Sequence, residues 1–208
     1  MSAVDRERKQ SKIDLGNLEE WLASLNTSVR VEELNQANLP RAAQLLNKTN
    51  QMNLSTRRMS EAEFQAWVRE KTRRAWTFRV SDRFGDSGLT GILTIEIDGL
   101  RATIIDFVLS CRVMGRKIEE AMLHVGINWA RSAGVQRVYA NYHHTGKNKP
   151  CYDFFEKSGL DCRDGNIFVW DAAQAYPLPP AIHLVHDNGG TFAKKSAEEN
   201  PSELLASI

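Results

Sequence analysis

Three consecutive strand-like runs, separated by short glycine-containing turns, constrain the fold of this chain most. The runs cover residues 75–81, 89–97 and 102–109, and the turns between them lie at 85–88 and 98–99. The runs are rich in β-branched and aromatic residues, and short turns of this composition join neighbouring antiparallel strands. The three runs therefore predict an antiparallel meander.

A long helix follows the meander and is apolar on two of its sides. Gly115 opens this helix and Gly134 ends it. One apolar side carries Ile118, Met122, Val125 and Trp129, and the other carries Leu123, Ile127 and Ala130. A helix that is apolar on two sides is expected to pack between other elements.

Shorter helices and strands flank this central unit. In chain order they are a strand at 29–34, helices at 39–48 and 60–70, a strand at 137–142, a helix at 150–158 and a strand at 167–170. Asn38 is expected to cap the first of these helices, and Ser60 and Glu63 form a capping box for the second. This order predicts an α/β domain with a mixed sheet and helices on both faces.

The chain divides into one domain and two flanking segments. Residues 1–28 form a charged lead-in that ends in a short amphipathic helix capped by Asn17, and residues 29–180 form the domain. Residues 181–208 follow a proline-rich stretch and are expected to form a polar tail.

The charge balance and the cysteines narrow the class of protein. A net charge of +1 gives no reason to expect nucleic acid or a membrane surface as a partner. No apolar run reaches the roughly 20 residues that a membrane span needs, and the charged start of the chain is not a secretory signal. Three cysteines without a C-x-x-C pair are typical of reduced thiols, so we expect a cytoplasmic protein.

The turn between the meander and the long helix is the first candidate for a binding site. It reads DFVLSCRVMGRK over residues 106–117. The N-terminus of a helix exposes unpaired N–H groups and the positive end of the helix dipole, and both suit a phosphate group. The alternative is an ordinary connection in which Arg112 and Arg116 are solvated.

Two motifs in this half of the chain resemble those of the GNAT acyltransferase superfamily. The pyrophosphate loop of that family, Q/R-x-x-G-x-G/A, is matched by Arg112 and Gly115. The later motif N-x-x-A-x-x-F/L-Y-x-x-x-G-F/L is matched by Asn148, Phe154, Gly159 and Leu160.

The resemblance implies a fold and a ligand. The sheet is mostly antiparallel, its two central strands splay apart near Leu109 and Tyr142, and the pantetheine arm of acyl-CoA or of an acyl carrier protein lies in the gap. Backbone N–H groups near residues 108–110 polarise the thioester, and no metal takes part. The implied binding residues are Val108, Leu109, Ser110, Arg112, Val113, Gly115, Arg116, Lys117, Asn148 and Phe155.

Three blocks of sequence narrow the resemblance to the C-terminal domain of FkbH-type proteins of polyketide biosynthesis. The blocks are NKTNQMNLSTRRMSEAE at 47–63, SDRFGD at 81–86 and LSCRVMGR at 109–116. This family implies an acyl carrier protein as partner and a separate HAD-like phosphatase domain or protein. The D-x-D-x-T motif of such a phosphatase is absent from the chain, so we expect neither phosphatase nor glyceryl-loading activity from it.

Two residues depart from the superfamily pattern. Phe155 stands where the superfamily often has a tyrosine as general acid, so acyl transfer is expected to be slow. Lys117 stands at a position that is usually small, and its side chain takes space that a pyrophosphate needs. Both departures disfavour a simple acetyl-CoA enzyme, and Lys117 favours a carrier-protein arm, which needs less room than free CoA. The alternative is that Lys117 points outward and pairs with the phosphates of CoA. Phe155 also favours the alternative function, a non-catalytic docking module for a carrier protein.

The candidate catalytic residues lie at the ends of two predicted strands. His143 and His144 either take a proton from an acceptor or are exposed loop residues. Cys111 lies beside arginines that favour its thiolate, the form that accepts an acyl group, or it is a buried structural cysteine. Asn148 either caps the helix that begins at Pro150 or contacts the thioester.

Other polar residues carry weaker signals. Arg57 and Arg58 either clamp an anionic acceptor or flank a helix cap. Asp82 is expected to form a local ion pair within a turn. His183 and His186 have no third ligand in view, so we expect no metal site.

Overall fold

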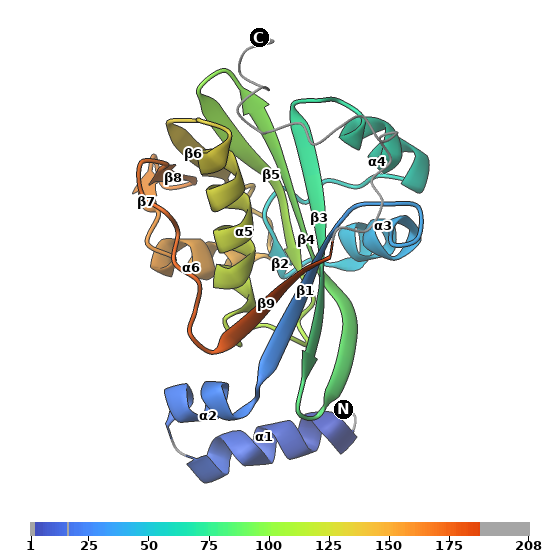
Figure 1. Cartoon of the computed structure of the whole chain (residues 1–208), viewed down its shortest axis with the longest axis vertical. Helices are drawn as coiled ribbons and strands as arrows, with labels where there is room; N and C mark the ends of the chain where they lie inside the picture. Colours follow the sequence, from blue (N-terminus) through green and yellow to red (C-terminus); the bar gives the residue numbers. More distant parts are fainter. Residues whose placement is uncertain (1–2, 16, 188–208) are drawn as a thin grey trace.

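A nine-stranded sheet forms the centre of the molecule and is built on the expected meander (Figure 1). The computed structural model describes residues 3–15 and 17–187. In it, β3 (Arg73–Asp82), β4 (Gly85–Asp98) and β5 (Arg101–Leu109) pair antiparallel in chain order. The antiparallel meander is therefore confirmed.

The other strands extend the sheet on both sides of the meander. They are β1 (Thr27–Glu33), β2 (Met52–Asn53), β6 (Arg137–Asn141), β7 (Asp161–Arg163), β8 (Ile167–Asp171) and β9 (Ile182–Asp187). The strand order is β7-β8-β6-β5-β4-β3-β1-β9, and β2 pairs with β5 outside this path. The pairs β1–β9 and β5–β6 are parallel and the others are antiparallel, so the sheet is mixed and mostly antiparallel.

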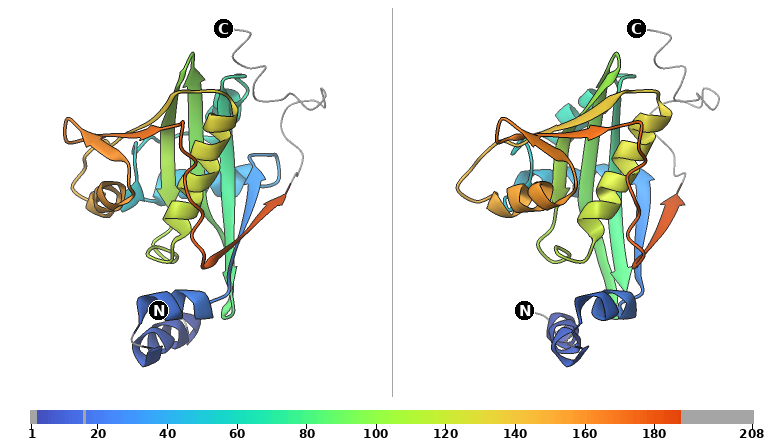
Figure 2. Two further views of the ribbon diagram at one scale, coloured as in Figure 1. Left: turned by 60° about the vertical axis from the view of Figure 1, so that its left-hand side comes forward. Right: turned by 90° about the vertical axis from the view of Figure 1, so that its left-hand side faces the viewer.

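Helices cover both faces of this sheet. They are α1 (Ala3–Leu15), α2 (Leu18–Ser24), α3 (Leu39–Lys48), α4 (Glu61–Val68), α5 (Ile118–Ser132) and α6 (Lys149–Lys157). Figures 1 and 2 show α5 and α6 on one face, α3 and α4 on the other, and α1 and α2 below the sheet. The predicted α/β fold with helices on both faces is confirmed. None of the helices within the described ranges is both long and apolar enough to cross a membrane.

Two apolar cores follow from the alternation of side chains along the central strands. Leu93 on β4 faces the larger core under α5, whereas its neighbour Ile92 faces the core under α3 and α4. Gly126 lets α5 approach the sheet closely, because a Cβ atom there would lie 2.4 Å from Cδ2 of Leu93. The residues of the two apolar sides expected for this helix are buried, except Trp129, which is partly buried against the same core.

The starts of β4 and of α5 differ from those predicted from the glycines in the sequence. The β3–β4 hairpin turns at residues 83–84, and the expected turn residues 85–88 belong to β4. Both Gly85 and Gly88 have positive φ angles. Gly88 lies beside a register irregularity between β3 and β4, whereas Gly85 pairs with Asp82 next to the turn. The long helix begins at Ile118, three residues after the glycine expected to open it.

The expected helix caps are confirmed in two cases and wrong in one. The side chain of Asn17 accepts a hydrogen bond from the N–H of Glu19, and Ser60 and Glu63 form the predicted capping box. Asn38 makes no cap, because its backbone is already helical. Its side chain instead donates to the hydroxyl of Thr77 at 3.2 Å.

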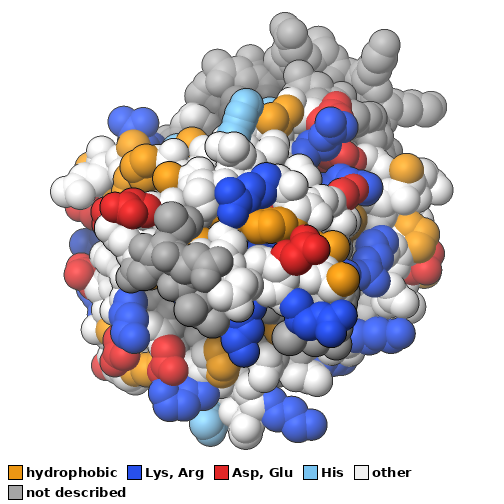
Figure 3. Space-filling model, turned by 90° about the horizontal axis from the view of Figure 1, so that it is seen from below, with side chains coloured by type: hydrophobic (Ala, Val, Ile, Leu, Met, Phe, Trp, Pro, Cys, Tyr) orange, Lys and Arg blue, Asp and Glu red, His pale blue; other side chains and the backbone are white. Residues whose placement is uncertain are grey.

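Both flanking segments contribute ordered elements to the structure. The charged lead-in contains the helix α1, and Figure 3 shows positive and negative side chains interspersed over this lower face. Ile182–Asp187, expected within the polar tail, forms β9 and pairs in parallel with β1. The rest of the expected tail, residues 188–208, lies outside the described residues.

A buried carboxylate connects the N-terminal helix to the domain. Asp82, which was expected to pair locally, accepts hydrogen bonds from Arg8 at 2.8 and 3.0 Å and forms an ion pair with Arg116 at 2.5 Å. The Asp82 side chain has no exposed surface. The sequence separation of Arg8 and Asp82 explains why a local pattern did not predict this contact.

We predict that Asp82→Ala lowers the free energy of unfolding by about 3–5 kcal/mol, because it leaves two largely buried guanidinium groups without their shared carboxylate. Chemical denaturation measures this change. Asp86→Ala is the matched control, because its exposed ion pair with Arg79 should contribute at most about 1 kcal/mol. Equal effects of the two substitutions would show that the buried cluster does not hold α1 in place.

Candidate functional site

The two central parallel strands separate, as the resemblance implies. β5 and β6 pair only over Arg101–Ile104 of β5 and Arg137–Ala140 of β6. Beyond these residues β5 continues to Leu109 without a partner in β6. The edge of β5 that points toward β6 would therefore be free at this end of the sheet.

The short strand β2 occupies this edge. Met52 pairs with Leu109 and Asn53 pairs with Val108, in antiparallel register. The opposite edge of β5 is taken by β4, which pairs with the same two residues. β2 therefore lies where β6 has diverged and fills the gap between the two strands.

Hydrogen bonds close the gap from both sides. The N–H of Leu54 donates to the C=O of Phe107 at 3.1 Å, and the N–H of His143 donates to the C=O of Leu54 at 2.9 Å. Met52, Asn53 and Leu54 are at most 2% exposed. The backbone edge that the resemblance implies for a pantetheine arm is thus engaged by the chain itself.

The N–H group expected to polarise a thioester is also engaged. The N–H of Ser110 donates to the C=O of Thr90 at 2.8 Å, on the β4 side. Because a polarising group needs a free donor aimed at the carbonyl oxygen, this amide cannot serve without a change in the sheet edge.

The side chain of Asn148 does not cap α6, and its contact to a thioester stays a prediction. Asn148 is fully buried. Its amide donates to the C=O of Asn53 at 3.0 Å and to the C=O of His143 at 2.8 Å, and its oxygen accepts from the hydroxyl of Tyr142 at 2.7 Å. Asn148 therefore ties β2 to the loop that follows β6.

The turn expected to bind phosphate holds a carboxylate of the same chain. The N–H of Gly115, which has a φ of +73°, donates to the carboxylate of Glu119 at 2.7 Å. Burial raises the pKa of Glu119 to about 7, although the backbone N–H groups of Gly115 and of Glu119 itself oppose this rise. A carboxyl group of the chain thus occupies part of the site proposed for a phosphate.

The other side chains of this turn point in three directions. Arg116 is buried against Asp82, and Val113 is buried in the core. Lys117 pairs with Glu120 at 2.6 Å, whereas Arg112 is exposed. The turn therefore does not gather its cations around one phosphate position.

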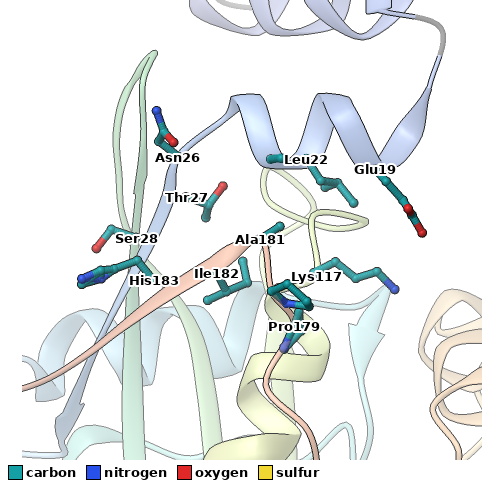
Figure 4. A pocket seen from close by; sticks show the side chains of 12 residues that line it. Glu19, Leu22, Asn26, Thr27, Ser28, Lys117, Pro179, Ala181, Ile182 and His183 are labelled. Atoms are coloured by element: carbon teal, nitrogen blue, oxygen red, sulfur yellow. The ribbon is translucent and has the colours of Figure 1, made fainter.

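Lys117 lies beside a largely apolar cavity of about 940 Å³. Figure 4 shows this cavity between α2, the first residues of β1 and β9, and the residues before α5. Its apolar lining comes from Leu22, Ala23, Pro179, Pro180, Ala181 and Ile182. Of the predicted binding and catalytic residues only Lys117 lines it, so we do not assign the candidate site to this cavity.

Phe155 is part of the core rather than of a site surface. Its ring has no exposed surface and contacts Phe107, Phe154 and Phe168 at centroid distances of 5.2–5.3 Å. A tyrosine there would bury its hydroxyl among these rings. Phe155→Tyr is therefore not expected to restore a general acid.

The remaining predicted residues gather at the mouth of the filled gap. Leu109, Ser110, Cys111 and Arg112 line a polar cavity of about 800 Å³ together with residues of α3 and of the loop after β6. Cys111 is an exposed free cysteine, which excludes the buried reading of that residue. His143 and His144 are exposed as well, and they follow β6 at this end of the sheet.

The other arginines considered as anion ligands have structural partners. Arg57 forms an ion pair with the buried Asp106 at 2.5 Å. Arg58 donates to the C=O of Leu46 and to the side chain of Asn50, so it holds the chain that leads into β2. Within the described residues no group of three or more His, Cys, Asp or Glu side chains could hold a metal ion.

Comparison with known proteins identifies the fold. Neither a protein-family model nor a curated protein matches the chain. Among solved structures it is similar to a domain from Methanocaldococcus jannaschii DSM 2661, with 12% identity, a TM-score of 0.54, and coverage of 70% of this chain and 99% of that one. It is also similar to spermidine N-acetyltransferase from Vibrio cholerae in complex with CoA and spermine, with 14% identity, a TM-score of 0.52, and coverage of 71% and 97%.

At these identities the likeness establishes the fold alone. The chain has the mixed α/β fold of the GNAT acetyltransferases, with its separated central strands. What it binds or transfers does not follow from the fold.

Sequence reasoning missed the residues that fill the site. Two-residue strands such as β2 have no periodic signal, and the stretch around Met52 is polar. Glu119 did leave a signal, because it lies one helical turn before Met122 and Leu123 on a buried part of α5. An acidic residue at such a position indicates a buried carboxylate that needs donors.

We predict that the buried Glu119 makes the protein less stable as the pH rises from about 4.5 to about 7. The folded state holds the Glu119 proton up to about pH 7, whereas the unfolded chain releases it near 4.5, so the folded state binds more protons in this window. Relative to Glu119→Gln, the free energy of unfolding of the wild type should fall by up to about 3 kcal/mol across the window and then stay level.

Urea denaturation of both proteins between pH 4.5 and 8 measures this difference, because the other titrating groups are common to them. Parallel curves over the whole range would show that Glu119 is not protonated in the folded protein at neutral pH.

Proposed function

We propose that this chain is an acyltransferase-type domain that binds an acyl-pantetheine thioester, and that the thioester is presented by an acyl carrier protein rather than as free acyl-CoA. The observation that carries the proposal is the separation of β5 and β6, the feature in which a GNAT fold receives pantetheine, with β2 lying in it. The CoA complex of the Vibrio cholerae enzyme, which shares this fold, supports a pantetheine ligand.

The preference for a carrier protein follows from what occupies the site. A pantetheine arm that lies along β5 must displace Met52 and Leu54, and exposing each of these buried side chains costs about 1.5–3 kcal/mol. A carrier protein adds protein–protein contacts that can offset this cost, whereas free CoA cannot. Free CoA also brings a pyrophosphate to a turn in which Gly115 is already bonded to Glu119.

In this proposal the acyl group is transferred directly. The acceptor attacks the thioester carbonyl, the C–S bond breaks, and pantetheine leaves as a thiol with the proton that the acceptor releases. Phe155 cannot supply that proton, so transfer is slow. The exposed His143 and His144 are the candidates to accept a proton from the acceptor. If Cys111 accepted the acyl group first, transfer would instead proceed in two steps through a thioester on that residue.

The positive charge at the mouth of the gap disfavours a polyamine such as the one in the structural neighbour. The Vibrio cholerae enzyme was solved with spermine, a polycation. Among the described residues, the lining of the cavity beside Cys111 includes Arg41, Lys48, Arg112 and Lys147 and no acidic side chain. A polyamine acceptor is therefore not part of the proposal.

We place this activity in polyketide or related secondary metabolism in the cytoplasm. Support comes from the three sequence blocks that resemble FkbH-type proteins, in which a HAD-like phosphatase acts beside the GNAT-like domain. In that setting a separate HAD-like domain or protein is a second partner.

A second candidate function is a non-catalytic docking module for the same carrier protein. Two observations favour it: β2 closes the gap between β5 and β6, and the core contains Phe155 where a catalytic tyrosine would stand. Single-turnover transfer from an acetylated carrier protein to added amines, alcohols and thiols separates the two functions. Binding without any transfer would support the docking module.

We predict that an acetylated carrier protein binds more tightly than acetyl-CoA. Glu119→Ala should then improve the affinity for acetyl-CoA by about tenfold, because it frees the N–H of Gly115 and the space beside it for the pyrophosphate. Calorimetry with both ligands measures the dissociation constants.

Glu120→Ala is the matched control, since this neighbouring carboxylate pairs with Lys117, whereas the N–H of Gly115 donates to Glu119. It should leave the affinity for acetyl-CoA within about twofold. A wild type that prefers acetyl-CoA would overturn the carrier-protein preference, and a wild type that binds neither ligand would overturn the thioester proposal itself.

A further inference from the structure

The polar cavity at the mouth of the filled gap has a one-sided charge. Its volume is about 800 Å³, within the range of small-molecule sites. Three separate parts of the chain form it: α3 with the residues that follow, the turn after β5, and the loop after β6. Each part contributes cations, which are Arg41 and Lys48, Arg112, and Lys147 respectively.

The four cations of this cavity differ from nearby cations in their ion pairing with carboxylates. Within the described residues, no carboxylate forms an ion pair with any of them. Arg41 bonds to Gln44 and Arg112 bonds to Ser110, and both of these partners are neutral. Close by, Arg57 pairs with Asp106 and Lys149 pairs with Asp153.

The sequence keeps acidic residues out of all three parts. No Asp or Glu occurs over residues 34–60, 107–118 or 121–152, although acidic residues make up half of the charged residues of the chain. The C-terminal end of α3 brings a partial negative charge of about one half, which offsets the four cations only in part. Like charges held around one hollow repel each other until an anion enters it.

We propose that this cavity is a binding site for a phosphate-bearing ligand. Arginine and lysine in convergent positions are the usual partners of phosphate oxygens. The inference goes beyond the proposed function, because the site would bind its anion whether or not an acyl group is transferred. Two sources share this chemistry: the phosphodiester of a carrier-protein arm and a free phosphorylated acceptor.

Pyrophosphate is the first probe, because it carries several charges and no other recognition group. We expect calorimetry at low ionic strength to show binding of pyrophosphate to the wild type. Lys48→Gln and Lys147→Gln should each weaken it by about fivefold, and the double variant by more than tenfold. Lys71→Gln is the control, since this exposed lysine lies between α4 and β3, outside the cavity.

Cys111 provides a readout inside the cavity, and Cys162 on β7 provides one outside it, since both thiols are exposed. Alkylation of each is followed by peptide mass spectrometry in the same sample. Anionic iodoacetate, compared with neutral iodoacetamide, should favour Cys111 over Cys162 by about threefold or more. Pyrophosphate should slow the alkylation of Cys111 and leave Cys162 unchanged, and the double variant should lose both effects.

A wild type that does not bind pyrophosphate, or a double variant that binds it as tightly as the wild type, would overturn the inference. So would equal protection of the two cysteines. Phosphopantetheine, pantetheine without its phosphate and glycerol 3-phosphate then identify the source. Tighter binding of phosphopantetheine than of both others supports the carrier arm, whereas equal binding of the two phosphate compounds supports a free phosphorylated acceptor.

Discussion

The pairing of β2 with the end of β5 is the contact on which the site depends. Where β6 diverges, the edge of β5 carries backbone N–H and C=O groups in a buried position, and such groups need partners. A bound pantetheine arm is one possible partner, and another strand of the same chain is a second. Here Met52 and Asn53 pair with that edge, and Asn148 fixes them to the chain beyond β6.

In the turn before α5, groups of the same chain again take the positions that a ligand would take. Glu119 accepts a hydrogen bond from the N–H of Gly115, which a phosphate would otherwise accept. Asp82 forms ion pairs both with Arg116 and with Arg8 of α1. These contacts change where positive charge is available to bind a ligand. In the part of the chain that the structure describes, this charge lies at the mouth of the gap beside Cys111, where four cations line a cavity without an acidic partner. It does not lie at the helix N-terminus that the motif indicated.

The sequence predicted the parts of the fold that depend on local pattern. Alternation along β3 to β5, the two apolar sides of α5 and the capping box at Ser60 are each encoded within one segment, and the structure confirms them. The parts that it did not predict depend on contacts between distant segments. The position of α1 depends on the hydrogen bonds from Arg8 to Asp82. The strand β9 depends on its pairing with β1, which lies near the other end of the sequence. Of the candidate site, the sequence left open whether Cys111 is exposed or buried, and the structure shows it exposed. The segment that fills the gap has too few residues for any periodic signal.

Hydrogen exchange of two backbone amides tests the central claim, that the chain closes its own gap between β5 and β6. The N–H of Leu54 and the N–H of His143 are the donors that link β2 to Phe107 and to the chain after β6. In the free protein, measured by NMR, both should exchange as slowly as the paired amides of β4 and β5. Exchange of both amides as fast as that of the exposed residues 146–147 would show that the gap is open in solution and that the edge of β5 is free for a ligand.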